Sequence, residues 1–100
     1  MTTDTITKTK TNTELAEPSN FKVIYKNDNQ TTFEFVVNSC VEHFDYTLED
    51  GFELAKKVND IGSAVVAVLP HEIAEQKSND IILAARAQGF PFVVKIEKNV

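Results

Sequence analysis

Cysteine and glycine are scarce in this chain of 100 residues, which has one cysteine and only three glycines. A single cysteine, Cys40, excludes an internal disulfide framework and is typical of a reducing compartment. The glycines do not form a phosphate-cradling pattern, and the spacing of a calcium-binding loop is absent as well. These absences argue against a disulfide-stabilised secreted domain, a nucleotide-binding loop and a calcium site.

Positive charge is also in short supply, because ten Lys and Arg residues stand against fifteen Asp and Glu residues. The formal net charge is −5 and the pI is near 4.9. A nucleic-acid-binding domain needs a basic patch, so this balance argues against nucleic acid as a partner. An acidic surface instead fits solubility, or a partner that presents cationic groups.

Long apolar runs are missing too. The longest run, residues 64–69, has the length of a buried strand and falls far short of the ~20 residues that a membrane helix needs. Residues 1–8 contain no apolar stretch of the kind found in a secretory signal. We therefore expect a cytoplasmic protein that does not interact with a membrane.

The first twenty residues differ in composition from the rest of the chain. Seven of the first thirteen are threonine, and none of the first twenty is aromatic. Such a segment cannot bury enough apolar area to offset the entropy lost on ordering. We predict a flexible N-terminal extension over residues 1–20, followed by one domain over residues 21–100. Across the whole chain 42% of the residues are apolar, which suffices for one core.

Residues 21–26 have the composition and alternation of a strand, with Phe21, Val23 and Tyr25 on one face. A polar turn follows at residues 27–30, since Asn and Asp side chains bond nearby backbone amides. Thr31 is then predicted to cap a helix, and Glu34 completes a capping box. The inward stripe predicted for this helix consists of Phe33, Val37, Cys40, Val41 and Phe44.

A second helix is predicted to begin at Thr47, which pairs with Asp50 as the earlier threonine does with its glutamate. Residues 59–62 end this helix. Its predicted inward side chains are Leu48, Phe52, Ala55 and Val58.

The continuous apolar run at residues 63–69 predicts the central strand of a sheet. Pro70 suits the first position of a third helix, which ends at Gly89. Residues 92–97 alternate and predict the last strand. The predicted inward side chains of the third helix are Ile73, Ala74, Ile81, Ala84 and Ala85.

The order of these elements is β-α-α-β-α-β. We predict an α+β fold, a two-layer sandwich in which helices cover one face of a three-stranded antiparallel sheet. This layering is the simplest arrangement that buries the apolar stripes of all the elements.

Catalytic and metal-binding motifs are incomplete in this chain. Residues 71–75 begin like a zinc-protease helix, but Glu75 stands where the second histidine belongs. Cys40 and His43 are close enough on one helix to touch, yet Cys40 lies in the apolar stripe, where a thiol stays protonated and inert. We predict that the protein is not an enzyme and binds no metal or cofactor.

On local residues alone the polar corner at Asn27, Asp28 and Asn29 is only a turn between a strand and a helix. Its wider context is more specific, because several segments occur in a familiar order and spacing. These are Lys22-Val23-Ile24 leading to Asn27-Asp28, Thr31 with Glu34-Phe35-Val36-Val37, Glu72-Ile73-Ala74-Glu75 with Lys77, Ala85-Arg86, and Gly89-Phe90-Pro91-Phe92. With these segments, residues 21–98 resemble the ClpS family of protease adaptors.

The resemblance implies an adaptor that binds substrates with a free, bulky hydrophobic N-terminal residue (an N-degron) and delivers them to a Clp AAA+ unfoldase. It also implies a monomer that contacts the N-terminal domain of ClpA or ClpC through Glu72 and Lys77. A free α-amino group is a cation with three donors, so it needs a carboxylate and amide oxygens. The family positions for the amine are Asn27, Asp28 and Asn59. Those for the side-chain pocket are Thr31, Phe33, Val36, Ala55, Val58 and Phe92.

Four positions depart from the family pattern. Asn59 stands where the family has a histidine, and Asn29 replaces the second acid of the corner. Asparagine can accept through its amide oxygen, but it cannot titrate near neutral pH. Phe33 stands where methionine is common and Ala55 where a larger residue is usual, so the two changes can compensate in volume.

Two other functions remain open from the sequence. The changes at Asn29 and Asn59 motivate a diverged regulator that docks on the unfoldase without capturing N-degrons. The C-terminal domain of the ribosomal stalk protein shares the general fold, although the Asn27-Asp28 corner has no role there.

Overall fold

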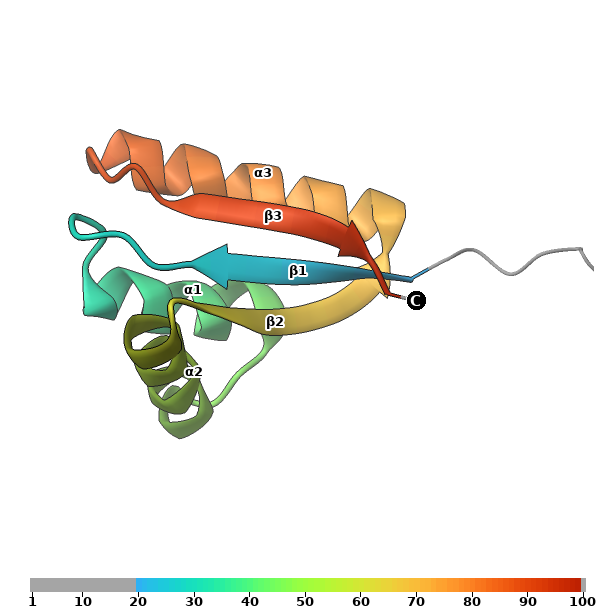
Figure 1. Ribbon diagram of the computed structural model, residues 1–100. Coiled ribbons are helices and arrows are strands. Elements are labelled where there is room, and N and C mark those ends of the chain that lie inside the picture. The colour runs from blue at the N-terminus through green and yellow to red at the C-terminus, as the bar shows by residue number, and fades with distance from the viewer. Residues whose placement is uncertain (1–19, 100) are drawn as a thin grey trace, which may run out of the picture.

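The protein is described here by a computed structural model that covers residues 20–99. Its elements are β1 (Asn20–Lys26), α1 (Phe33–Phe44), α2 (Leu48–Ile61), β2 (Ser63–Pro70), α3 (His71–Ala87) and β3 (Val93–Lys98). The predicted order and the α+β fold with an antiparallel three-stranded sheet are confirmed (Figure 1). The predicted extension lies outside the described residues, apart from Asn20, which begins β1.

The strand order in the sheet is β2-β1-β3, so β1 is the central strand and pairs antiparallel with both neighbours. The prediction that residues 63–69 form the central strand is therefore wrong. Val65 and Val68 of this edge strand are 42% and 44% exposed on the face that the helices leave open. A bulge opposite Val23 and Ile24 inserts Val66 into β2 as an extra residue, and its side chain is buried. This extra inward residue interrupts the alternation of the edge strand, so its sequence resembles a continuously apolar run.

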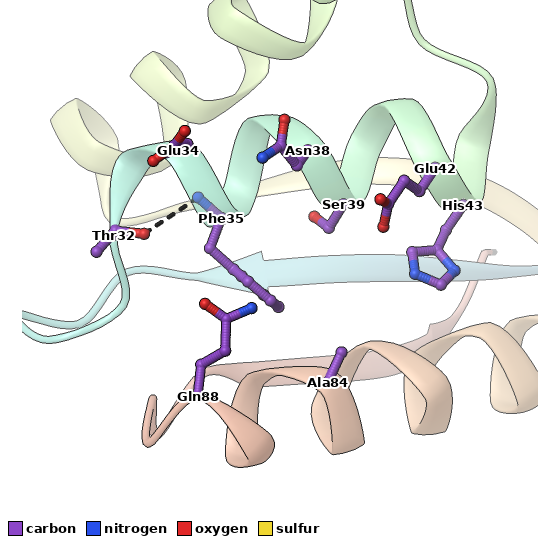
Figure 2. Close-up of a pocket in the computed structure, with 9 residues that line it drawn as sticks. All are labelled: Thr32, Glu34, Phe35, Asn38, Ser39, Glu42, His43, Ala84 and Gln88. Atoms are coloured by element: carbon purple, nitrogen blue, oxygen red, sulfur yellow. Dashed lines mark hydrogen bonds between the residues drawn. The ribbon is translucent and has the colours of Figure 1, made fainter.

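The cap of α1 is Thr32, not the predicted Thr31. The Thr32 hydroxyl accepts a hydrogen bond from the Phe35 amide at 3.1 Å, drawn as the dashed line in Figure 2. Thr31 belongs to the preceding turn instead, where its amide and its hydroxyl both donate to the carboxylate of Asp28. The predicted cap of α2 is confirmed, since the Thr47 hydroxyl accepts from the Asp50 amide at 3.0 Å.

The buried face of α1 is rotated from the predicted stripe. Phe33 is 39% exposed, whereas Phe35 and Val36, which the prediction left out, are buried. α1 contacts α2, α3 and β2, so its buried arc is wider than one stripe. The buried residues of α1 are Phe35, Val36, Val37, Ser39 and Cys40.

In α2 the predicted burial of Leu48 and Phe52 is wrong, because they are 67% and 52% exposed. Gly51 faces α1 instead, and a side chain there would place its Cβ 3.2 Å from the carbonyl oxygen of Val37. The close approach of the two helices through this glycine turns Phe52 outward. The residues that α2 buries are Gly51, Leu54, Ala55 and Val58.

α3 lies against the sheet with a narrow stripe, so two of its predicted inward residues are exposed, Ile73 and Ala84. Pro70 is the residue before the helix rather than its first residue, and Gln88 follows its last one. The chain then turns at Gly89, whose φ of 82° favours glycine. The stripe of α3 consists of Ala74, Ser78, Ile81 and Ala85.

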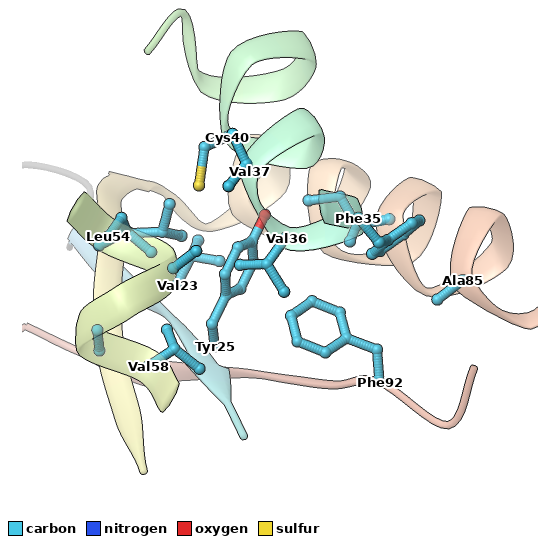
Figure 3. Close-up of a cluster of buried hydrophobic side chains, with 14 of the residues drawn as sticks. Val23, Tyr25, Phe35, Val36, Val37, Cys40, Leu54, Val58, Ala85 and Phe92 are labelled. Carbon is cyan, nitrogen blue, oxygen red and sulfur yellow. The ribbon is translucent and has the colours of Figure 1, made fainter. Parts of the chain in front are cut away.

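The core is centred on Tyr25 of β1, which is fully buried between the sheet and α1 (Figure 3). Its hydroxyl lies 2.8 Å from the hydroxyl of Ser39, which in turn donates to the carbonyl oxygen of Val36 at 2.8 Å. The Tyr25 ring packs edge-on against Phe92, with 4.9 Å between ring centroids. Of the three residues predicted to share one face of β1, Val23 and Tyr25 are fully buried, and Phe21 is partly buried against the core.

Candidate functional site

The polar corner between β1 and α1 is organised by the carboxylate of Asp28. One oxygen, Oδ1, accepts the amides of Gln30 and Thr31 at 2.8 and 2.7 Å. The other, Oδ2, accepts the hydroxyl of Thr31 at 2.7 Å. The Asn27 amide donates to the carbonyl oxygen of Gly62 at 2.9 Å, which ties the corner to the end of α2. The turn is therefore held by hydrogen bonds within itself and by one hydrogen bond to the end of α2.

These contacts also set the ionisation of Asp28. Partial burial raises the pKa of its carboxyl group, but the hydrogen bonds from Thr31 and Gln30 outweigh burial and hold the pKa below its ordinary value. The carboxylate is thus negatively charged at neutral pH. A charged acceptor with one lightly used oxygen is the group that a cationic ligand needs.

Beside the corner lies a cavity of about 230 Å³. Polar residues from the corner and from the end of α2 line one part of it, and the buried side chains Val36, Ala55 and Val58 line another. The structure thus brings together all predicted amine and pocket residues except Phe92. The full lining is Asn27, Asp28, Asn29, Thr31, Phe33, Val36, Ala55, Val58 and Asn59.

Phe92 does not line this cavity. It is only 2% exposed and lies in the core, with its ring 4.9 Å from that of Tyr25 and 5.9 Å from that of Phe35. Phe92 therefore packs against β1 and α1 within the core and contributes no surface to the cavity.

Asn59 reaches the cavity from the last turn of α2 and is exposed. Its Nδ2 donates to Oδ1 of Asp60 at 3.3 Å. An amide nitrogen only donates, so the amide oxygen of Asn59 is the atom that can accept from a ligand. A histidine at this position would bring a titratable ring instead.

Phe33 belongs to the cavity wall but is not isolated. Its ring packs edge-on against Phe52 of α2, with ring centroids 5.0 Å apart and planes at 69°. Sequence reasoning treated Phe52 as a core residue and so missed its place beside the site. Helical periodicity carries no signal for this contact, because it depends on how α1 and α2 cross.

The two residues predicted to face the unfoldase lie on α3. Glu72 is exposed in the first turn, whereas Lys77 is partly buried and holds its Nζ 5.8 Å from the ring centroid of Phe44. With roughly 3.6 residues per turn, the two side chains leave the helix in different directions. A partner that contacts both must span the N-terminal half of α3.

A second hollow of about 350 Å³ lies between α1 and α3 (Figure 2). Its wall carries the carboxylates of Glu34 and Glu42, the amide of Asn38 and the ring of His43. Among residues 20–99, no three metal-ligating side chains come together to hold a metal ion, and no helix is long and apolar enough to cross a membrane. The corner cavity is the better candidate site, because it combines a charged acceptor with an apolar wall.

Comparison with known proteins decides the family. The family model described as ATP-dependent Clp protease adaptor protein ClpS matches residues 16–95. The chain belongs to the ClpS family. The ClpS adapter of Campylobacter jejuni is 34% identical over 92 residues, which are 92% of this chain and 96% of that protein. The ClpS adapter of Treponema denticola is 35% identical over 82% of this chain and 81% of its own.

A solved structure agrees with this assignment. The structure of Agrobacterium tumefaciens ClpS2 bound to L-phenylalaninamide matches with a TM-score of 0.80 and 30% identity, over 83% of this chain and all of that one. As a member of the ClpS family, the protein is an adaptor of a Clp protease and not itself an enzyme. This assignment replaces the ribosomal-stalk hypothesis.

Proposed function

We propose that this ClpS-family adaptor binds proteins with a free, bulky hydrophobic N-terminal residue and delivers them to a Clp AAA+ unfoldase. The observation that carries the proposal is a cavity in which a charged carboxylate, amide side chains and an apolar wall meet. An N-terminal residue offers the complementary pair of groups, a cationic amine and an adjacent side chain. No internal residue of a protein offers both.

The amine is the polar half of this recognition. An α-ammonium group has three N–H donors, and Asp28, Asn27 and Asn59 present oxygen acceptors around the cavity. Oδ2 of Asp28 accepts a single hydrogen bond within the turn, so it retains capacity for a ligand. An N-acetylated end has lost the charge and two of the donors, and it leaves these acceptors unpaired.

The side chain is the apolar half. Val36, Ala55 and Val58 are buried residues that still line the cavity, so a hydrophobic side chain entering it displaces water from an apolar wall. The ligand named for Agrobacterium ClpS2, L-phenylalaninamide, has a free amine and an aromatic side chain. This ligand supports the proposal that polar residues bind the amine and the apolar wall binds the side chain.

Delivery is assigned to α3. Glu72 and Lys77 offer opposite charges to the N-terminal domain of the unfoldase, ClpA or ClpC. The adaptor acts as a monomer, and its location is the cytoplasm. The single cysteine, which is buried, supports a reducing location.

The test is direct binding of short fluorescent peptides that begin with Phe, Leu, Trp or Tyr, each compared with its N-acetylated form. Fluorescence anisotropy with the full chain should show saturable binding of the free peptides and a large loss on acetylation. Equal binding of free and acetylated peptides would contradict recognition of the amine.

A second candidate function is favoured by Asn29 and Asn59, which lack the charge and the titratable ring usual at these positions. That function is regulation of the unfoldase by a protein that docks on it and captures no N-degron. It predicts that binding to the isolated unfoldase N-terminal domain falls in Glu72→Ala and Lys77→Ala variants. It also predicts that none of the four free peptides binds.

A further inference from the structure

Two aromatic rings stand at the surface beside the cavity. Phe33 is 39% exposed and Phe52 is 52% exposed, although both side chains are large and apolar. They meet edge-on with centroids 5.0 Å apart, which lies within the range of favourable aromatic pairs. Neither ring belongs to the buried cluster of the core. The pair therefore needs an explanation other than core packing.

The two rings have different relations to the cavity. Phe33, the first residue of α1, is part of its lining, whereas Phe52 is not. Phe52 comes from α2, which also supplies Ala55, Val58 and Asn59 to the lining. Phe52 thus connects the Phe33 ring at the start of α1 to α2, the helix that forms the opposite wall.

We propose that Phe52 is a specificity-determining residue that acts through Phe33 and favours aromatic over aliphatic N-terminal residues. The inference rests on the proposed function, and it concerns a residue that does not line the pocket. An exposed ring with no neighbour samples several rotamers, and binding must then restrict them at a cost in affinity. Held by Phe52, the Phe33 ring is already ordered and presents a fixed aromatic surface to the ligand.

The expected effect follows from the size of aromatic pair interactions. A well-placed pair of rings gains about 2- to 12-fold in affinity beyond the contribution of buried area. The wild-type chain should therefore bind a Phe-initiated peptide more tightly than a matched Leu-initiated peptide by a factor of this order. Removing Phe52 should move that ratio toward one.

The experiment measures the ratio of the two dissociation constants by anisotropy with the full chain. Phe52→Ala should lower the ratio to near one. Phe52→Leu should lower it as well, because leucine supplies bulk but has no aromatic ring. Phe52→Tyr keeps the ring and should keep the ratio. Leu48→Ala is the matched control, since Leu48 lies one turn away on α2, is 67% exposed and does not line the cavity. It should leave the ratio unchanged.

A double-mutant cycle tests whether Phe52 acts through Phe33. Phe33→Ala should also bring the ratio near one, and adding Phe52→Ala to it should change the ratio no further. Additive effects on the ratio, or an unchanged ratio in Phe52→Ala, would overturn the inference while leaving amine recognition intact. If the wild-type chain binds neither free peptide, the proposed function fails and the inference fails with it.

Discussion

The charge of Asp28 is the feature of the site whose removal is most informative. Replacement by alanine would also delete the acceptor of three hydrogen bonds that hold the corner, so a loss of binding could reflect a broken turn. Asp28→Asn is the cleaner change. The amide oxygen can still accept from the Gln30 and Thr31 amides, and the Thr31 hydroxyl can rotate to accept from the new NH₂ group.

The size of the effect follows from the hydrogen bond that is weakened. A hydrogen bond to a charged group contributes about 1.5–3 kcal/mol, which corresponds to a roughly 10- to 150-fold change in dissociation constant. Asp28 is partly exposed, and solvent screening reduces the energy of such a charge pair. We therefore expect Asp28→Asn to weaken binding of a Phe-initiated peptide about 10- to 30-fold.

The assay is anisotropy with the free and the acetylated peptide, accompanied by a thermal melt of each variant. Asp80→Asn is the matched control, because it removes the same charge from an exposed position on α3 that does not line the cavity. It should bind like wild type. If Asp28→Asn keeps full affinity at an unchanged melting temperature, the carboxylate does not hold the amine and the reasoning is refuted.

Three further predictions concern pH, the core and the thiol. Affinity should stay level between about pH 5 and 7, because the pKa of Asp28 is lowered and Asn59 does not titrate, and should fall above about pH 8 as the peptide amine loses its proton; a titration of dissociation constants with a clear step near pH 6.5 would contradict this. Ser39→Ala should destabilise the fold by about 1–3 kcal/mol in urea unfolding, because it leaves the buried hydroxyl of Tyr25 without its partner, and Tyr25→Phe in the same chain should recover part of the loss. Cys40 is fully buried, and burial raises the pKa of its thiol to about 12, so a thiol reagent should label it only after unfolding; rapid labelling of the native chain would show that this region opens readily.

Local rules were sufficient for the elements of secondary structure. Alternation over residues 21–26 predicted β1 and its buried face, since a strand turns successive side chains to opposite sides whatever surrounds it. The cap at Thr47 was equally predictable, because the hydroxyl and the amide it binds are three residues apart. The same rule placed the first cap one residue too early, because hydrogen bonds to Asp28 hold Thr31 in the turn and the helix begins after Thr32.

Such local rules predicted only part of the candidate site. Asn27 and Asp28 were visible as a polar corner, but the local evidence made it a turn. Residues of α2 joined it through family resemblance, and the structure places Ala55, Val58 and Asn59 beside the corner as that resemblance required. Phe92 was assigned to the pocket in the same way and lies in the core instead.

By itself, the sequence determined the number, type and order of the helices and strands and most of their boundaries, because these depend on periodicity and on caps within a few residues. Only the tertiary structure decided which strand is central, which faces of the helices are buried and which residues meet at the cavity. The close approach of α1 and α2 at Gly51 shows the reason, since it turns Phe52 away from the core and toward Phe33. Such a contact depends on how two helices cross, and no pattern within either helix encodes that angle.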